Sequence, residues 1–110
     1  MRVLLANEPR AYRDVISGTL EALRPELEIL TAEPGELDAE VLRLSPHFVL
    51  CSRVTPVVES RAPVWIELYP DQAPGAVVDL RGEREVLPEM RFEKLLSTVD
   101  RARLSFVLPA

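Results

Sequence analysis

Three short apolar runs in the first half of the chain alternate with segments of helical periodicity. The runs RVLLAN, LEILTA and HFVLCS occupy residues 2–7, 27–32 and 47–52. Uninterrupted apolar runs of this kind are typical of central strands that are covered on both faces. Between them, apolar residues follow helical spacing over 9–25 and 36–45. This alternation, with its short connections, predicts right-handed crossovers in a parallel sheet and therefore the α/β class.

The second half of the chain is less regular. Only nine residues separate Ser52 from the next apolar run at 62–69, whereas a helical crossover usually needs about a dozen or more. A full helix is therefore not expected there. The Pro and Gly content of 71–84 favours a loop and a hairpin around 81–84, and a short helix is the alternative. Helical spacing predicts a last helix over 91–106.

The totals of the chain limit its class. A length of 110 residues predicts one domain spanning residues 1–110. A composition with 47% hydrophobic and 28% charged residues is ordinary for a soluble globular protein. The net charge of −5 disfavours nucleic-acid binding. No apolar stretch reaches the roughly 18 residues of a membrane helix, and the chain enters a strand at once, so we expect a cytoplasmic protein without membrane contact.

The reactive side chains do not form a catalytic pattern. Cys51 is the only cysteine, which excludes an intramolecular disulfide, and its place inside a strand predicts a packing role. His47, the only histidine, is predicted at the sheet end opposite Glu8, so it cannot act there as a base. Glu8 with Asp71 or Glu67 lacks the fixed spacing of a metal site. We therefore expect no enzyme activity, no metal and no cofactor.

Two strand ends make the chain resemble the receiver domain of bacterial response regulators, the phosphate-accepting module of two-component systems. In that family the first strand ends in an acidic pair that helps to hold magnesium, and the corresponding positions here are Asn7 and Glu8. The family's third strand ends in the phosphate-accepting aspartate, with a proline four residues later. The segment SRVTP places Ser52 and Pro56 at those positions.

Two further family positions are also substituted. The serine or threonine that ends the family's fourth strand corresponds to Leu68, or to Tyr69 if the register slips by one. The lysine of the family's Lys-Pro pair corresponds to Glu89 in EVLPEM. The resemblance therefore implies a degenerate receiver, in which the acceptor, a metal ligand, the switch hydroxyl and the lysine are all replaced. We expect Ser52 to cap nearby backbone groups.

The resemblance also implies an architecture. Receivers have a flavodoxin-like three-layer sandwich with a mainly parallel five-stranded sheet in the order 2-1-3-4-5. The first and last helices pack on one face and the remaining helices on the other. In this chain the third and fourth helices are expected to be shortened or replaced by a loop or hairpin.

Both faces of the predicted fourth strand carry large apolar side chains, so both need cover. Exposing several hundred Å² of apolar sheet costs several kcal/mol at about 25 cal/mol per Å². The candidate covers are VTPVV at 54–58, the tail FVLPA at 106–110 and a second copy of the chain. The candidate interaction surface, for a protein partner or a homodimer, consists of Val54, Val57, Val58, Trp65 and Tyr69.

The leading functional hypothesis is a stand-alone pseudo-receiver, a regulatory or protein-interaction module that lacks the phosphoacceptor aspartate. The alternative is a small-ligand-binding flavodoxin-like domain. Its ligand would occupy the crevice at the carboxyl ends of strands one and three, between Glu8, Ser52 and the loop at Pro70.

Overall fold

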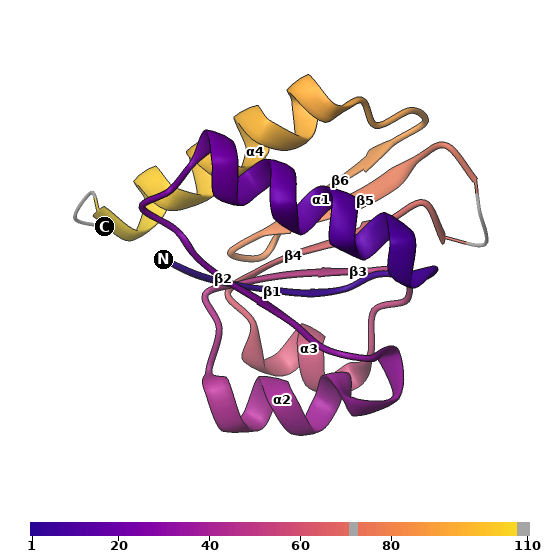
Figure 1. The fold of residues 1–110 in the computed structure, drawn as a ribbon, viewed down its shortest axis with the longest axis vertical. Helices are drawn as coiled ribbons and strands as arrows, with labels where there is room; N and C mark the ends of the chain where they lie inside the picture. The colour runs from indigo at the N-terminus through magenta and orange to yellow at the C-terminus, as the bar shows by residue number, and fades with distance from the viewer. Residues whose placement is uncertain (71–72, 108–110) are drawn as a thin grey trace.

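A computed structural model describes residues 1–70 and 73–107 of the chain. A single sheet lies between two layers of helices (Figure 1). The elements in chain order are β1 (Arg2–Ala6), α1 (Arg10–Leu23), β2 (Glu28–Thr31), a 3-10 turn (Pro34–Glu36), α2 (Leu37–Leu44), β3 (Phe48–Cys51), α3 (Pro56–Arg61), β4 (Val64–Leu68), β5 (Ala76–Leu80), β6 (Glu83–Leu87) and α4 (Phe92–Val107). No helix within the described ranges is long and apolar enough to cross a membrane.

The sheet has six strands in the order β2-β1-β3-β4-β5-β6. The first four in that order are parallel, as predicted, but β5 runs antiparallel to β4 and β6 antiparallel to β5. The α/β class is confirmed. The predicted order 2-1-3-4-5 is present, but the sheet has a sixth strand and β5 is antiparallel to β4, because residues 69–75 form too short a connection to cross over the sheet. The chain turns back beside β4 instead.

The hairpin predicted around 81–84 is present as β5 and β6. Arg81 and Gly82 form its turn, and both have positive φ angles, of 52° and 94°. A two-residue turn with two positive φ angles matches the right-handed twist of the flanking strands. The alternative of a short helix is wrong for residues 73–84, and residues 71–72 lie outside the described part of the chain.

The third helix is shortened, as predicted. The connection between β3 and β4 spans residues 52–63, and α3 occupies six of them. Thr55 caps this helix by accepting a hydrogen bond from the backbone N–H of Val58, and Pro56 begins it. β3 and β4 are each shorter than the predicted strands, which leaves room for one and a half turns of helix.

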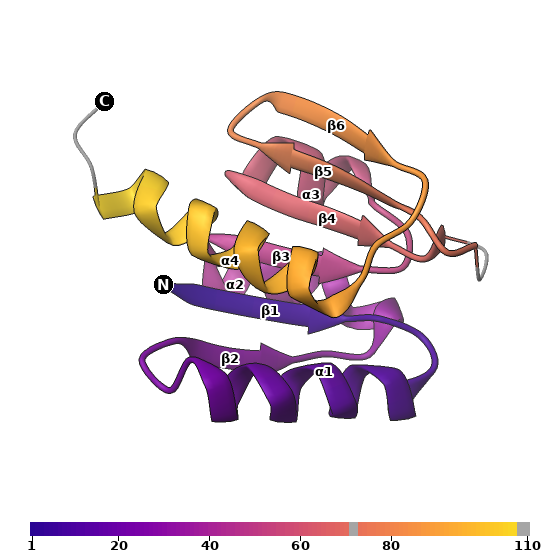
Figure 2. The same cartoon turned by 90° about the horizontal axis from the view of Figure 1, so that it is seen from above.

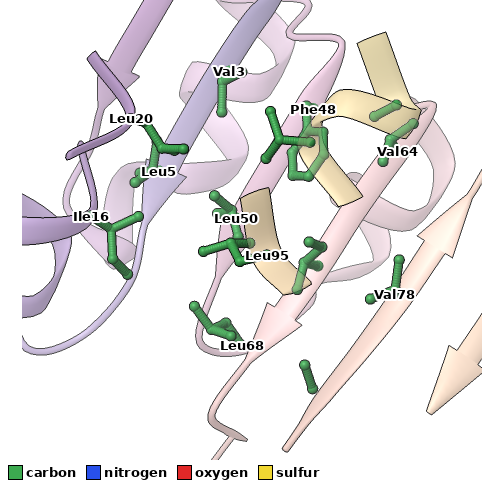
Figure 3. Close-up of a cluster of buried hydrophobic side chains, with 14 of the residues drawn as sticks. Val3, Leu5, Ile16, Leu20, Phe48, Leu50, Val64, Leu68, Val78 and Leu95 are labelled. Carbon is green, nitrogen blue, oxygen red and sulfur yellow. The ribbon is translucent and has the colours of Figure 1, made fainter. Parts of the chain in front are cut away.

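Each face of the sheet packs against a helical layer and forms a core of its own. The first and last helices, α1 and α4, cover one face, and α2 and α3 cover the other (Figure 1). Figure 3 shows the first core, in which side chains of the strands meet those of α1 and α4. Its fully or almost fully buried members include Leu5, Leu20, Phe48, Leu50, Ile66 and Val99.

The second core shows what covers the other face of β4. Val58, from the segment VTPVV, is fully buried there with Leu4, Val49 and Trp65. The segment VTPVV, one of the three candidate covers, therefore covers this face of β4. In the tail, Phe106 packs against the first core, and residues 108–110 lie outside the described residues. Because helices cover both faces of the sheet, its burial does not require a second copy.

The spacing of apolar residues in α1 predicts a wider buried face than the helix has in the structure. Ile16 and Leu20 are buried, whereas Tyr12, Val15 and Leu23 are 43%, 65% and 47% exposed. Arg13 is buried instead, with only 4% of its surface exposed. The buried positions 13, 16 and 20 follow the one side of the helix that faces the sheet.

Candidate functional site

An open cleft of about 1270 Å³ lies at the carboxyl ends of the parallel strands. The arrowheads of β1, β3, β4 and β6 point toward the same end of the sheet (Figure 2). Residues that line the cleft follow these four strand ends or begin the neighbouring helices. Those that carry polar or aromatic chemistry include Glu8, Tyr12, Ser52, Tyr69 and Glu89. The structure therefore brings four of the predicted site residues together at this cleft: Glu8, Ser52, Glu89 and Tyr69, which is the alternative to Leu68.

Ser52 joins the ends of β3 and β1. Its Oγ accepts a hydrogen bond of 2.8 Å from the backbone N–H of Glu8. The same hydroxyl lies 3.5 Å from the Glu8 carbonyl oxygen, to which it donates. The predicted capping role of Ser52 is confirmed, since the hydroxyl satisfies a backbone donor just beyond β1.

Asn7 does not line the cleft. It is 1% exposed, and neither side-chain atom, Nδ2 nor Oδ1, has a hydrogen-bond partner among the described residues. The backbone carbonyl of Asn7 accepts a bond of 3.4 Å from the buried guanidinium of Arg13. That guanidinium also forms an ion pair of 3.0 Å with Glu33. The first strand therefore presents a single carboxylate to the cleft, that of Glu8.

The end of β4 presents Tyr69 and buries Leu68. Leu68 is 1% exposed and belongs to the first core, so of the two candidate residues only Tyr69 lines the cleft. Tyr69 has a φ of 52°, a left-handed conformation that turns the chain directly after the strand. Its hydroxyl donates a bond of 2.6 Å to the carbonyl of Met90, and its ring lies 5.5 Å from that of Tyr12.

The Tyr69 phenol remains neutral at physiological pH. Partial burial raises its pKa, and the neighbouring Tyr12 and the negative charge of Glu89 raise it further. Tyr69 therefore acts as a hydrogen-bond donor and an aromatic surface.

Glu89 lies just beyond β6 and lines the cleft. Its Oε1 is 3.1 Å from the Nε of Arg91, and both side chains are mostly exposed. An exposed pair of this kind is weak, so it leaves much of the carboxylate's field in place. The edge of the cleft at β6 is therefore acidic.

The candidate interaction surface is only partly exposed. Val58 is fully buried and Trp65 is 2% exposed, so the expectation that these two residues form part of an accessible surface is wrong. The guanidinium of Arg84 also covers Trp65, at 5.0 Å from the ring centre. Val54 and Val57 are half-buried against the second core, and Tyr69 is half-buried in the cleft.

Cys51 and His47 take no part in the cleft. Cys51 is buried, as predicted, and burial together with the charge of Glu67 raises the pKa of its thiol to about 12. A thiol with such a pKa is not a nucleophile at neutral pH. His47 lies at the amino end of β3, where its Nδ1 accepts a bond of 3.0 Å from the backbone N–H of Arg2. It is therefore remote from Glu8, as predicted.

The carboxylates around the cleft do not converge. Glu67 accepts a bond of 2.8 Å from the backbone N–H of Val54, and Asp71 lies outside the described residues. Over residues 1–70 and 73–107, no group of three or more His, Cys, Asp or Glu side chains is arranged to hold a metal ion.

The sequence predicts Tyr69 as a site residue but neither Tyr12 nor Met90, although all three line the cleft. The available signal was that Tyr12 lies in the first turn of the helix that follows β1, since helices after parallel strands begin at the carboxyl end of the sheet.

Comparisons with protein-family models, curated proteins and solved structures found no match to the chain.

Proposed function

We propose that this chain is a non-enzymatic, cytoplasmic regulatory module that binds a protein partner at the carboxyl-end cleft and does not accept a phosphoryl group. The observation that most directly supports this proposal is the hydrogen bond between the Ser52 hydroxyl and the backbone N–H of Glu8. By the sequence resemblance, this hydroxyl corresponds to the acceptor carboxylate of a receiver, and here it holds the backbone instead. The proposal thus combines a receiver-like strand arrangement with a site adapted to binding.

The chemistry of the cleft supports the negative part of the proposal. A carboxylate accepts a phosphoryl group when a divalent cation neutralises the crowded oxygens and a lysine balances the developing charge. Here Glu8 is the only carboxylate at the end of β1, and the resemblance aligns Glu89 with the family's lysine. Arg53 is the one positive charge among the described residues that line the cleft, against the two carboxylates of Glu8 and Glu89, which repel a phosphoryl donor.

The size of the cleft supports a polypeptide occupant. Small-molecule sites usually enclose about 300–1,000 Å³ and cover most of their ligand. This cleft exceeds that range at about 1270 Å³ and is open to solvent. The alternative, a small ligand, is favoured by the contact between Tyr12 and Tyr69, which provides an aromatic wall for a flat molecule.

Incubation with acetyl phosphate and Mg²⁺, followed by intact mass spectrometry, tests the proposal. We expect no mass change in this protein under conditions that modify a functional receiver in parallel. A mass gain of one phosphoryl group at any residue would contradict it. Thermal shift with nucleotides and sugar phosphates tests the alternative, because a ligand that binds only the native state raises Tm. Reproducible stabilisation would favour the small-ligand function.

A further inference from the structure

The aromatic wall of the cleft is held in a fixed orientation. Tyr69 is anchored at both ends, since its backbone N–H donates to the carbonyl of Gly75 at 2.9 Å and its hydroxyl donates to that of Met90. Its ring contacts the Tyr12 ring at a tilt of 49°. Tyr12 stays 43% exposed. An aromatic surface that is both fixed and accessible costs little entropy when a partner stacks on it.

Carboxylates flank this aromatic wall. Glu8 follows β1 and Glu89 follows β6, and both line the same cleft as the two tyrosines. The Glu8 backbone, and not its carboxylate, bonds to Ser52, so the acid can change without loss of that bond. Arg53 also lines the cleft and is itself engaged in an interaction. The net charge of −5 adds a long-range attraction for cations.

We propose that the cleft binds an extended segment of a partner protein through an arginine whose guanidinium stacks on Tyr12 and Tyr69 and pairs with Glu8. A guanidinium is planar, stacks on aromatic faces and pairs with a carboxylate through two parallel N–H bonds, whereas an ammonium is a strongly hydrated point charge. This inference rests on the proposed protein-binding function and specifies the chemistry of the partner.

A polypeptide fits the cleft better than a free cation. Pro9, Pro34 and Pro74 also line the cleft, and they lack backbone N–H groups and have apolar rings. Its volume exceeds what one guanidinium group fills. Aromatic side chains line the grooves that recognise extended, proline-rich segments in other proteins. The arginine is therefore expected to be the anchor of a longer contact.

Peptide titrations followed by amide NMR shifts test the inference. The probes are capped pentapeptides, acetyl-Ala-Pro-X-Pro-Ala-amide, in which X is arginine, lysine or citrulline. Citrulline has nearly the shape of arginine without the charge. The arginine peptide is expected to move the amide signals of Glu8, Tyr12 and Met90 and to bind with a Kd of about 1 mM or lower. Its affinity should exceed that of the citrulline peptide at least about fivefold.

Two variants test the contacts, and two serve as controls. Glu8→Gln keeps the backbone bond to Ser52 and removes the charge, so the preference for arginine over citrulline should fall to what the contact with the two tyrosines supplies. Tyr12→Ala should weaken binding of the arginine peptide about fivefold or more. Glu93→Gln and Val15→Ala change exposed residues away from the cleft and should leave binding unchanged. Circular dichroism confirms that each variant is folded.

Several outcomes would overturn the inference. These are no binding of the arginine peptide at about 1 mM, equal affinity of the arginine and citrulline peptides, or shifts confined to another surface. Agmatine, a small amine that carries a guanidinium group, distinguishes the two possible sources of the cation, an arginine within a polypeptide and a free small molecule. If it binds as tightly as the arginine peptide, the occupant is a small molecule and the polypeptide assignment is wrong. Equal affinity of the arginine and citrulline peptides would overturn the arginine site alone, whereas tight binding of agmatine would also overturn the protein-binding part of the proposed function. The acetyl phosphate test is independent of both results.

Discussion

Among single residues, His47 shows how a side chain remote from the cleft couples the fold to pH. Its Nδ1 accepts the Arg2 N–H, and its ring meets the edge of the Phe106 ring at 5.0 Å. Desolvation of the ring lowers the pKa of His47 below 6.5, and the positive charges of the N-terminus, Arg2 and Arg81 lower it further. The native state therefore favours the neutral imidazole, which alone can accept that hydrogen bond.

The sign of the pH dependence follows from this lowered pKa. Between the native pKa and 6.5 the unfolded chain binds more protons than the native chain, so the free energy of unfolding rises with pH. The contribution of His47 is complete above about 6.5 and is lost as pH falls through the native pKa. We expect a modest fall in Tm below about pH 6.5, because the ring is exposed and partly screened.

His47→Asn provides the matched variant. Its side-chain oxygen can accept the Arg2 N–H, and it does not titrate. Thermal melts of both proteins below pH 6.5 should show a flatter slope for His47→Asn. Asp100, whose pKa is lowered by Arg24, titrates below its ordinary value of 3.8 and so lies outside this window. Identical slopes in the two proteins would show that His47 does not control stability in this range.

At the scale of elements, the β5–β6 hairpin replaces a helical crossover, and its turn depends on Gly82. This residue has a φ of 94°, a region in which a Cβ is strained even though no neighbouring atom lies within 4 Å. The Gly82 N–H also donates a bond of 2.9 Å to Asp79, whose carboxylate pairs with Arg84 at 3.3 Å. The turn, the acid and the arginine therefore form one local unit.

Gly82→Ala is expected to lower the free energy of unfolding by about 1 kcal/mol or more, because alanine is strained in this conformation. Gly18→Ala is the matched control. Gly18 lies in α1 with open space around the position of its missing Cβ. Alanine there should stabilise the protein by about 0.5–1 kcal/mol through helix propensity. Urea denaturation measures both, and equal effects of the two substitutions would contradict this account of the turn.

At the scale of the whole molecule, β6 leaves one edge of the sheet open. It is the last strand in the sheet, and its residues are exposed, with Val86 72% exposed. Its sequence begins with Glu83, Arg84 and Glu85. Charged side chains on an edge strand discourage pairing between molecules. If two copies paired antiparallel about Glu85, two like charges would lie directly opposite each other, which is destabilising.

The double variant Glu83→Thr/Glu85→Thr is therefore expected to self-associate at concentrations at which the parent protein does not. Threonine removes the repulsion and favours the strand conformation. Sedimentation velocity over a range of concentrations measures the effect. A control, Glu36→Gln/Glu93→Gln, makes the same charge change at exposed positions away from the edge. Association of the control to the same extent would show that the edge is not the cause.

The sequence by itself determined the local elements and their class. Apolar runs with the lengths of strands located the first four strands, and apolar spacing of helical period located the first, second and last helices. The residues at 81–84 also predicted the hairpin. These features follow from period and turn chemistry, which depend on neighbours a few positions apart. The sequence predicted that Ser52 would cap backbone groups, but its partner Glu8 lies 44 residues away and is brought to it only by the pairing of β1 with β3.

Only the tertiary structure decided where β5 and β6 lie and which residues meet at the cleft. The direction of β5 depends on whether its connection can cross the sheet, and that in turn depends on where β4 ends. Arg13 is buried while Tyr12 is exposed because the orientation of α1 is set by packing against strands distant in sequence. Tyr12, Tyr69 and Met90 come from three separate segments, and their meeting is a non-local contact that no periodicity encodes.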